Sequence, residues 1–151
     1  MKKHFLFILL IIAFISACEK DDFCIQNPVT PSLVIDFYNN TNRETLKDVT
    51  TLYVSVDGKD SIYEGSRENS ITIPLNTLTN ETIYNFSDGT NVDKFTISYT
   101  TEEIYVSRSC GYKVIFNDVT FISENNWILG FTPSNLTTID NQDETHVQIF
   151  H

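Results

Sequence analysis

Apolar and polar residues alternate along most of this chain, and this period of two limits the fold more than any other feature. Leu33, Ile35 and Phe37 lie two positions apart and alternate with Asp36 and Tyr38. Leu52, Val54 and Val56 alternate in the same way with Tyr53 and Ser55. Successive side chains of a β-strand point to opposite faces, so the alternation predicts half-buried strands. Similar patterns occupy residues 71–73, 95–99, 104–107, 112–116, 127–131 and 147–150. Their Thr, Val, Ile, Tyr and Phe content favours a pleated surface.

Turn residues separate these segments at the spacing of a β-sandwich or barrel. Asp57–Asp60, Asp88-Gly89 and Asn125-Asn126 each supply Gly or Asn, which tolerate positive φ angles. Pro74 follows the segment 71–73 and indicates an edge strand, because proline cannot donate to a ladder. We expect an all-β, antiparallel two-sheet β-sandwich, Ig-like or related, of about eight to nine strands. A small closed β-barrel is the alternative.

The N-terminal segment has the layout of a secretory signal. Lys2 and Lys3 precede the apolar run 5–14, which leads into Ile15-Ser16-Ala17-Cys18. A membrane-spanning helix needs about 20 apolar residues, and this segment is shorter. A basic start, an apolar segment and a small residue favour a cleaved signal instead. The last four residues resemble the lipobox of bacterial lipoproteins, which implies cleavage after Ala17 and a diacylglycerol on the Cys18 thiol.

The cysteine count agrees with that interpretation. The chain has three cysteines, and in an oxidising compartment an unpaired one is a reactive liability. If Cys18 carries lipid, Cys24 and Cys110 remain and can form a disulfide. Such a bond closes a long loop of the unfolded chain, worth on the order of 4 kcal/mol in the entropy model. The alternative makes Cys110 a nucleophile or metal ligand, but no cysteine or histidine stands at a matching spacing.

These features divide the chain into a removed signal (1–17), a lipidated acidic tether (18–31) and a β-sandwich domain (32–151). The full sequence contains 10 basic and 20 acidic residues, and removal of Lys2 and Lys3 makes the mature chain more acidic. Such a balance argues against nucleic acid or anionic lipid surfaces as partners of the domain, since both select for Lys and Arg.

Four stretches together resemble a family of small lipoproteins of the Bacteroidota that has no known function. They are Thr30–Ile35 with Phe37-Tyr38, Ile73-Pro74-Leu75-Asn76-Thr77, Tyr105–Tyr112 and His146–Ile149. The resemblance extends from Cys24 to the C-terminus, and the Tyr105–Tyr112 stretch is its most specific part. It implies an envelope lipoprotein and supplies no catalytic residue.

Two short motifs resemble signals of the same phylum. Lys20-Asp21-Asp22 follows Cys18 directly and resembles a signal that sends lipoproteins to the outer face of the outer membrane. We therefore expect a surface-exposed, lipid-anchored protein, with a periplasm-facing outer-membrane anchor as the alternative. Any hydrophilic tether would carry similar charges. Asp60-Ser61-Ile62 resembles a three-residue O-glycosylation motif, which would modify Ser61; such short matches also occur by chance.

The sequence offers little sign of catalysis, and we expect no catalytic residue, no cofactor and no metal site. There is no Gly-x-Ser-x-Gly elbow and no Gly-rich phosphate loop. His146 is expected to be a solvent-facing strand residue. Arg108 is the most interesting position, because Tyr105 and Tyr112 flank it and Arg and Tyr are enriched at binding hot spots. The three residues form a candidate interaction surface, with a structural ion pair as the alternative for Arg108.

Two classes of function follow from these expectations. The first is a non-enzymatic interaction module at the outer membrane, docking onto an integral β-barrel protein or complex that assembles or exports outer-membrane proteins. The second is a glycan- or peptide-binding lipoprotein or enzyme of nutrient capture, for which exposed aromatic side chains would have to stack on sugars. Trp127, Tyr53, Tyr63 and Tyr84 are the candidates. In a small sandwich Trp127 is more often a core residue than a sugar platform. A structure in which Trp127 is buried and no concave aromatic pocket exists would leave the second class without support.

Overall fold

The computed structural model describes Cys24 and residues 29–151. Within these residues the secondary structure is entirely β, as predicted, and comprises ten strands. They are β1 (Leu33–Tyr38), β2 (Val49–Ser55), β3 (Tyr63–Glu68), β4 (Ser70–Ile73), β5 (Glu81–Ser87), β6 (Val92–Ser107), β7 (Gly111–Ser123), β8 (Gly130–Thr132), β9 (Asn135–Ile139) and β10 (Val147–Phe150). The strand number slightly exceeds the expected eight or nine, because β3, β5 and β9 were not predicted, whereas two predicted segments belong to the single strand β6.

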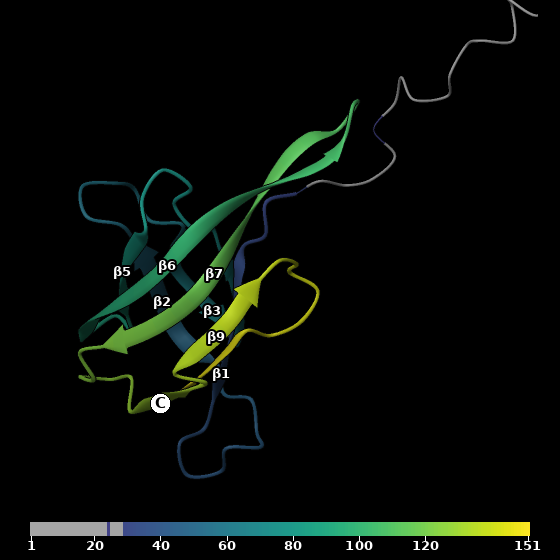
Figure 1. The fold of residues 1–151 in the computed structure, drawn as a ribbon. Coiled ribbons are helices and arrows are strands. Elements are labelled where there is room, and N and C mark those ends of the chain that lie inside the picture. Colours follow the sequence, from purple (N-terminus) through teal and green to yellow (C-terminus); the bar gives the residue numbers. More distant parts are fainter. Residues whose placement is uncertain (1–23, 25–28) are drawn as a thin grey trace, which may run out of the picture. The chain divides into compact units, whose positions relative to one another are not determined.

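The strands form two separate sheets. The first has the order β4-β1-β10-β8. The second has the order β3-β2-β5-β6-β7-β9, and its strands are labelled in Figure 1. Each sheet ends in edge strands, so neither closes into the barrel that was the alternative. The β-sandwich prediction is confirmed. Strand β4 is an edge, which agrees with the edge position that Pro74 indicated.

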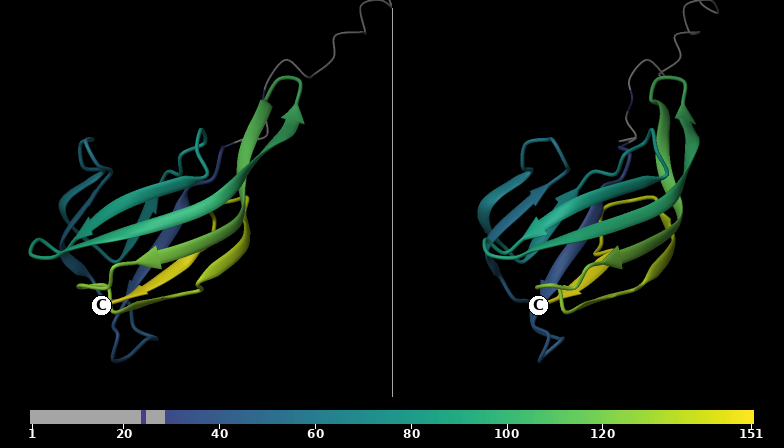
Figure 2. Two further views of the ribbon diagram at one scale, coloured as in Figure 1. Left: turned by 60° about the vertical axis from the view of Figure 1, so that its left-hand side comes forward. Right: turned by 90° about the vertical axis from the view of Figure 1, so that its left-hand side faces the viewer.

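One strand pair departs from the expected antiparallel arrangement. Strands β1 and β10 pair in parallel, with Ile35 opposite Val147 and Phe37 opposite Ile149. Both views in Figure 2 show the blue β1 beside the yellow β10. A parallel pair needs a long crossover connection, and here the crossover is nearly the whole domain. The first and last strands of the domain are therefore joined in the middle of one sheet.

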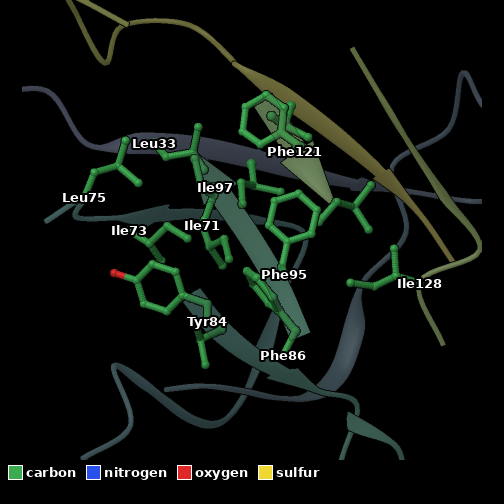
Figure 3. Packing of buried hydrophobic residues seen from close by; sticks show 14 of the residues in the cluster. Leu33, Ile71, Ile73, Leu75, Tyr84, Phe86, Phe95, Ile97, Phe121 and Ile128 are labelled. Atoms are coloured by element: carbon green, nitrogen blue, oxygen red, sulfur yellow. The ribbon is translucent and has the colours of Figure 1, made fainter. Parts of the chain in front are cut away.

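The core lies between the two sheets and is built from the alternating residues. Leu33, Ile35 and Phe37 are fully buried, and Leu52 and Val54 of the other sheet are buried as well. The shared cluster also takes residues from β4, β5, β6, β7, β9 and β10. Figure 3 shows side chains from both sheets converging, including Ile71, Phe86, Phe95 and Ile97. Each such side chain contributes about 1.5–3 kcal/mol on burial, so this core holds the sandwich together.

Some predicted segments differ from the observed strands. Residues 95–99 and 104–107 belong to the single strand β6. The segment 127–131 is mostly loop, and only its end enters the short strand β8. Strands β3, β5 and β9 lie in segments for which no alternation had been recognised.

The chain divides into two compact units, which we describe separately. Among the described residues, one unit contains Cys24 and Tyr105–Tyr112. The other contains Val29–Ile104 and Lys113–His151, and holds the core described above.

Candidate functional site

The first unit is built around the turn that joins β6 to β7, which is green in Figure 2. We call residues Tyr105–Tyr112 the hairpin tip. The Cys110 N–H donates to Ser107 Oγ at 3.0 Å, closing the turn. Gly111 follows with a φ of 74°, a conformation that costs a residue with a Cβ atom free energy and costs glycine little. The sequence Ser-Arg-Ser-Cys-Gly therefore matches the turn in which it lies.

The predicted disulfide is present at this tip. Cys24 and Cys110 are bonded, with their Cα atoms 4.8 Å apart. The two positions are 86 residues apart in the sequence, so the bond joins the N-terminal segment directly to the turn between two central strands. The alternative roles for Cys110, nucleophile or metal ligand, do not apply to a disulfide-bonded sulfur.

The structure also brings the two predicted surface tyrosines together. Tyr105 and Tyr112 are 58% and 64% exposed, and their rings meet edge to face with centroids 5.3 Å apart. This arrangement is one that aromatic pairs prefer. Arg108 lies in the turn between them and is also exposed. The tip thus presents two tyrosine rings with their hydroxyls and one guanidinium, and its eight residues include no acidic one.

Several predicted site residues lie elsewhere. Ser61 is exposed in the loop between β2 and β3, where the Lys59 N–H donates to the Val56 carbonyl and Gly58 has a φ of 72°. This placement suits a modified side chain, and its glycosylation stays a prediction. Residues Ala17, Cys18, Lys20, Asp21 and Asp22 lie outside the described residues, so the signal, lipidation and export predictions are not tested.

Two of the four aromatic residues proposed as sugar platforms are buried and a third is hydrogen-bonded to backbone, whereas Tyr53 is exposed at 38%. Trp127 is only 7% exposed, and its indole N–H donates to the Phe86 carbonyl at 3.0 Å. Tyr84 is buried, and its hydroxyl donates to the Pro74 carbonyl. Tyr63 exchanges hydrogen bonds with the backbone of Thr72. Trp127 and Tyr84 belong to the core and cannot stack on a sugar.

His146 is not the solvent-facing strand residue that the alternation predicted. The Val34 N–H donates to its Nδ1 at 2.9 Å, and its own backbone N–H donates to the Val34 carbonyl at 3.0 Å. Burial lowers the pKa of His146, outweighing the opposite effects of the Asn141 backbone and nearby acids. The side chain replaces a backbone acceptor at the edge of the parallel pair, which makes its role structural.

A concave surface that the sequence did not indicate lies between the β4–β5 loop and β5. An open cavity of about 510 Å³ is lined by Leu75 and its neighbours in the β4–β5 loop, by Ile83 and Tyr84 of β5, and by Val56 and Asp57 after β2. Beside it, the Tyr99 hydroxyl donates to the Asn76 carbonyl at 2.7 Å and lies 2.6 Å from Thr82 Oγ1. The Asn76 N–H in turn donates to Thr82 Oγ1 at 2.9 Å. This closed network of hydrogen bonds fixes the loop.

The tyrosines near this cavity remain protonated at neutral pH. Burial raises the pKa of Tyr84 to about 12, with a further contribution from Tyr99. Burial is also the main cause that raises the pKa of Tyr99. Both hydroxyls can donate and accept hydrogen bonds here, but neither can act as a base near neutral pH.

The chain matches one known protein family. A model described as a family of unknown function (DUF6452) matches residues 49–151. The chain belongs to this family. The match includes the hairpin tip, the β4–β5 loop and β10, whereas the stretch 30–38 precedes it. No curated protein and no solved structure matches the chain. Among the described residues, no helix is long and apolar enough to cross a membrane.

Proposed function

We propose that this family member is a lipid-anchored lipoprotein of the outer membrane in the Bacteroidota, facing the cell surface. We further propose that its domain is a non-enzymatic accessory module for an envelope β-barrel complex that assembles or exports outer-membrane proteins. The observation that carries the proposal is the Cys24–Cys110 disulfide. Stable disulfides belong to oxidising compartments, and this one uses two of the three cysteines. It leaves Cys18, at the end of the lipobox-like sequence, for the lipid.

The anchor would hold the domain firmly. Each buried methylene of an acyl chain contributes about 0.8 kcal/mol, so two or three chains retain a small domain at a bilayer. The tether residues Lys20, Asp21 and Asp22 support the surface-facing orientation through their resemblance to an export signal.

An interaction role is supported by the surface that the chain presents at its disulfide. Tyr105 and Tyr112 are held exposed and in contact with each other. Exposed aromatic side chains beside an arginine are the residue types that dominate binding energies at interfaces. A disulfide-closed tip also loses little conformational entropy when it binds, because its backbone is already restricted.

Affinity purification tests the proposed association. The full-length protein, carrying a C-terminal tag, is purified in mild detergent at native abundance and compared with a Cys18→Ala variant. We expect integral β-barrel proteins to co-purify with the wild-type protein and to be lost with the unanchored variant. Repeated recovery of the lipoprotein alone contradicts the accessory role.

An Arg108→Ala variant separates the two interpretations of that residue. If Arg108 belongs to a recognition surface, the variant should unfold at the same denaturant concentration as the wild type, and less of the β-barrel protein should co-purify with it. If a structural ion pair is its main role, the variant should be less stable than the wild type. Any loss of the co-purifying β-barrel protein should then match the loss of folded protein. Thermal and urea unfolding of the purified variant decide between these outcomes.

A further inference from the structure

We infer that the hairpin tip rests in the headgroup layer of the leaflet that holds the Cys18 acyl chains, and that the Cys24–Cys110 disulfide holds it there. This inference rests on the lipid anchor of the proposed function. It makes the lipid surface itself the ligand of the exposed tyrosines, in place of the protein contact that the proposed function assigns to the tip, so an integral protein partner would dock on another face of the domain.

The length of the tether supplies the first argument. Cys24 follows Cys18 by six positions, and six residues span at most about 22 Å when fully extended. The disulfide adds a Cα–Cα step of 4.8 Å to Cys110. The turn of the tip therefore lies within roughly 26 Å of the lipidated residue, whatever path the tether follows. This distance is shorter than the thickness of one bilayer.

The disulfide is what creates this short connection. Through the backbone alone, Cys110 is joined to Cys18 only by way of β1 to β6, the greater part of the domain. The first residue of the second unit is Val29, and the eleven positions from Cys18 could extend to about 40 Å. With the bond intact, the tip is, after Cys24 itself, the part of the described chain covalently nearest the anchor.

The chemistry of the tip suits a membrane–water boundary. Tyrosine is enriched there because its ring is apolar and its hydroxyl stays hydrated, and Tyr105 and Tyr112 are both more than half exposed. An arginine at the membrane–water boundary can bury its aliphatic side-chain carbons against the acyl chains and keep its guanidinium among the lipid phosphates. Arg108 provides this group. The chain has 20 acidic residues, and the nearest before the tip are Glu102 and Glu103 of β6. None lies in 105–112, so the tip itself carries no group that anionic headgroups repel.

Photocrosslinking of the lipidated protein tests the contact. A photoreactive phenylalanine analogue replaces Tyr105, Tyr112 or, as the control, Leu78, which is 92% exposed in the second unit. The proteins are reconstituted in vesicles of phosphatidylethanolamine and phosphatidylglycerol, and lipid adducts are counted by mass spectrometry. We expect a several-fold excess of lipid adducts at 105 and 112 over 78. Equal yields at the three positions overturn the inference.

Two variants test the role of the disulfide. A Cys24→Ser, Cys110→Ser double variant should lose the excess of adducts. Because this change also affects stability, a second variant keeps the bond and inserts a flexible Gly/Ser stretch of about twenty residues between Asp22 and Phe23. The insertion should also lower the excess, since the tip is then no longer confined near the anchor. An undiminished excess in both variants shows that the disulfide does not position the tip.

The outcomes separate this inference from the proposed function. Mass analysis of the N-terminal peptide establishes whether Cys18 carries lipid, and its absence overturns both proposals. If lipid adducts form at 105 and 112 but no barrel protein co-purifies, only the proposed association with a β-barrel complex is wrong. If the same analogues in intact cells crosslink to a protein in place of lipid, the tip is a protein-docking surface and the inference is wrong.

Discussion

The buried carboxylate of Asp93 accepts the backbone N–H of Trp127 at 2.8 Å. The same carboxylate accepts the N–H groups of Asn126 at 2.6 Å and Ile128 at 2.8 Å. One side chain at the start of β6 thus satisfies three successive donors of the loop between β7 and β8. A buried donor without a partner is costly, so Asp93 determines the path of this loop and, with it, the burial of Trp127.

Replacing Asp93 with asparagine should destabilise the domain by about 3 kcal/mol, because an amide offers one acceptor oxygen and turns an NH₂ group toward backbone donors. Urea unfolding measures the change. Asp143→Asn, at an exposed position in the loop before β10, is the matched control and should change stability by less than about 0.5 kcal/mol. Similar stabilities for both variants would show that the carboxylate does not hold the loop.

Trp127 is the only tryptophan, so its fluorescence reports directly on this loop. We expect a blue-shifted emission that acrylamide quenches poorly, because the ring is buried and its N–H is bonded to the Phe86 carbonyl. Unfolding should shift the emission to the red, and added oligosaccharides should leave it unchanged. An emission like that of free tryptophan in water, or quenching by a sugar, would reopen the glycan-binding function.

The hydroxyl network of Thr82 and Tyr99 should stabilise the β4–β5 loop. In Thr82→Val, the Asn76 N–H loses its acceptor and the Tyr99 hydroxyl loses a neighbour, so we expect a loss of about 2 kcal/mol. Urea unfolding gives this value, and hydrogen exchange at the Asn76 amide should accelerate. Thr96→Val, at a half-exposed position of β6, is the control for the same chemical change. Unaltered exchange at Asn76 would count against the network.

The stability of the protein should decrease on mild acidification because of its two described histidines. Burial is the main cause that lowers the pKa of both His146 and His151 from 6.5. The unfolded chain therefore binds protons first, and stability that is complete above the unfolded pKa is lost as the pH falls through the folded pKa. Each histidine contributes a slope of at most about 1.4 kcal/mol per pH unit.

Urea unfolding between about pH 7.5 and pH 5 measures this slope. His146→Asn keeps an acceptor for the Val34 N–H, because the asparagine Oδ1 can take the place of Nδ1, while removing the titration. His151→Asn removes the second titration. The double variant should show a clearly flatter pH profile than the wild type. An unchanged profile would assign the acid sensitivity to other groups.

Local patterns predicted those strands that bury one face cleanly. In β1 and β6, Leu33, Ile35, Phe95 and Ile97 are buried as their alternation indicated. Strand β5 was missed for a physical reason. The apolar Ile83 faces outward between the buried Thr82 and Tyr84, so apolar and polar residues do not alternate along this strand as its buried and exposed positions do. Trp127 was placed in a strand because its neighbours are apolar, but the distant Asp93 holds them in a loop.

The candidate site was partly predictable as well. The number of cysteines and the basic, apolar start of the chain were enough to predict the Cys24–Cys110 bond, which the structure confirms. The interaction surface expected at Tyr105, Arg108 and Tyr112 stays a prediction. The contact between Tyr105 and Tyr112 was not predictable, since it depends on the turn that pairs β6 with β7.

By itself, the sequence determined that this chain folds as β-strands, which face of the strongest strands is buried and which two cysteines pair. The strands follow from the alternation of side chains, which is local. The pairing follows from the number of cysteines together with the lipobox resemblance that assigns Cys18 to a lipid. Only the tertiary structure decided the parallel pairing of β1 with β10, the path of the loop that Asp93 holds and the ring contact between Tyr105 and Tyr112. Each of these depends on contacts between residues far apart in the chain, whose free energy no local pattern records.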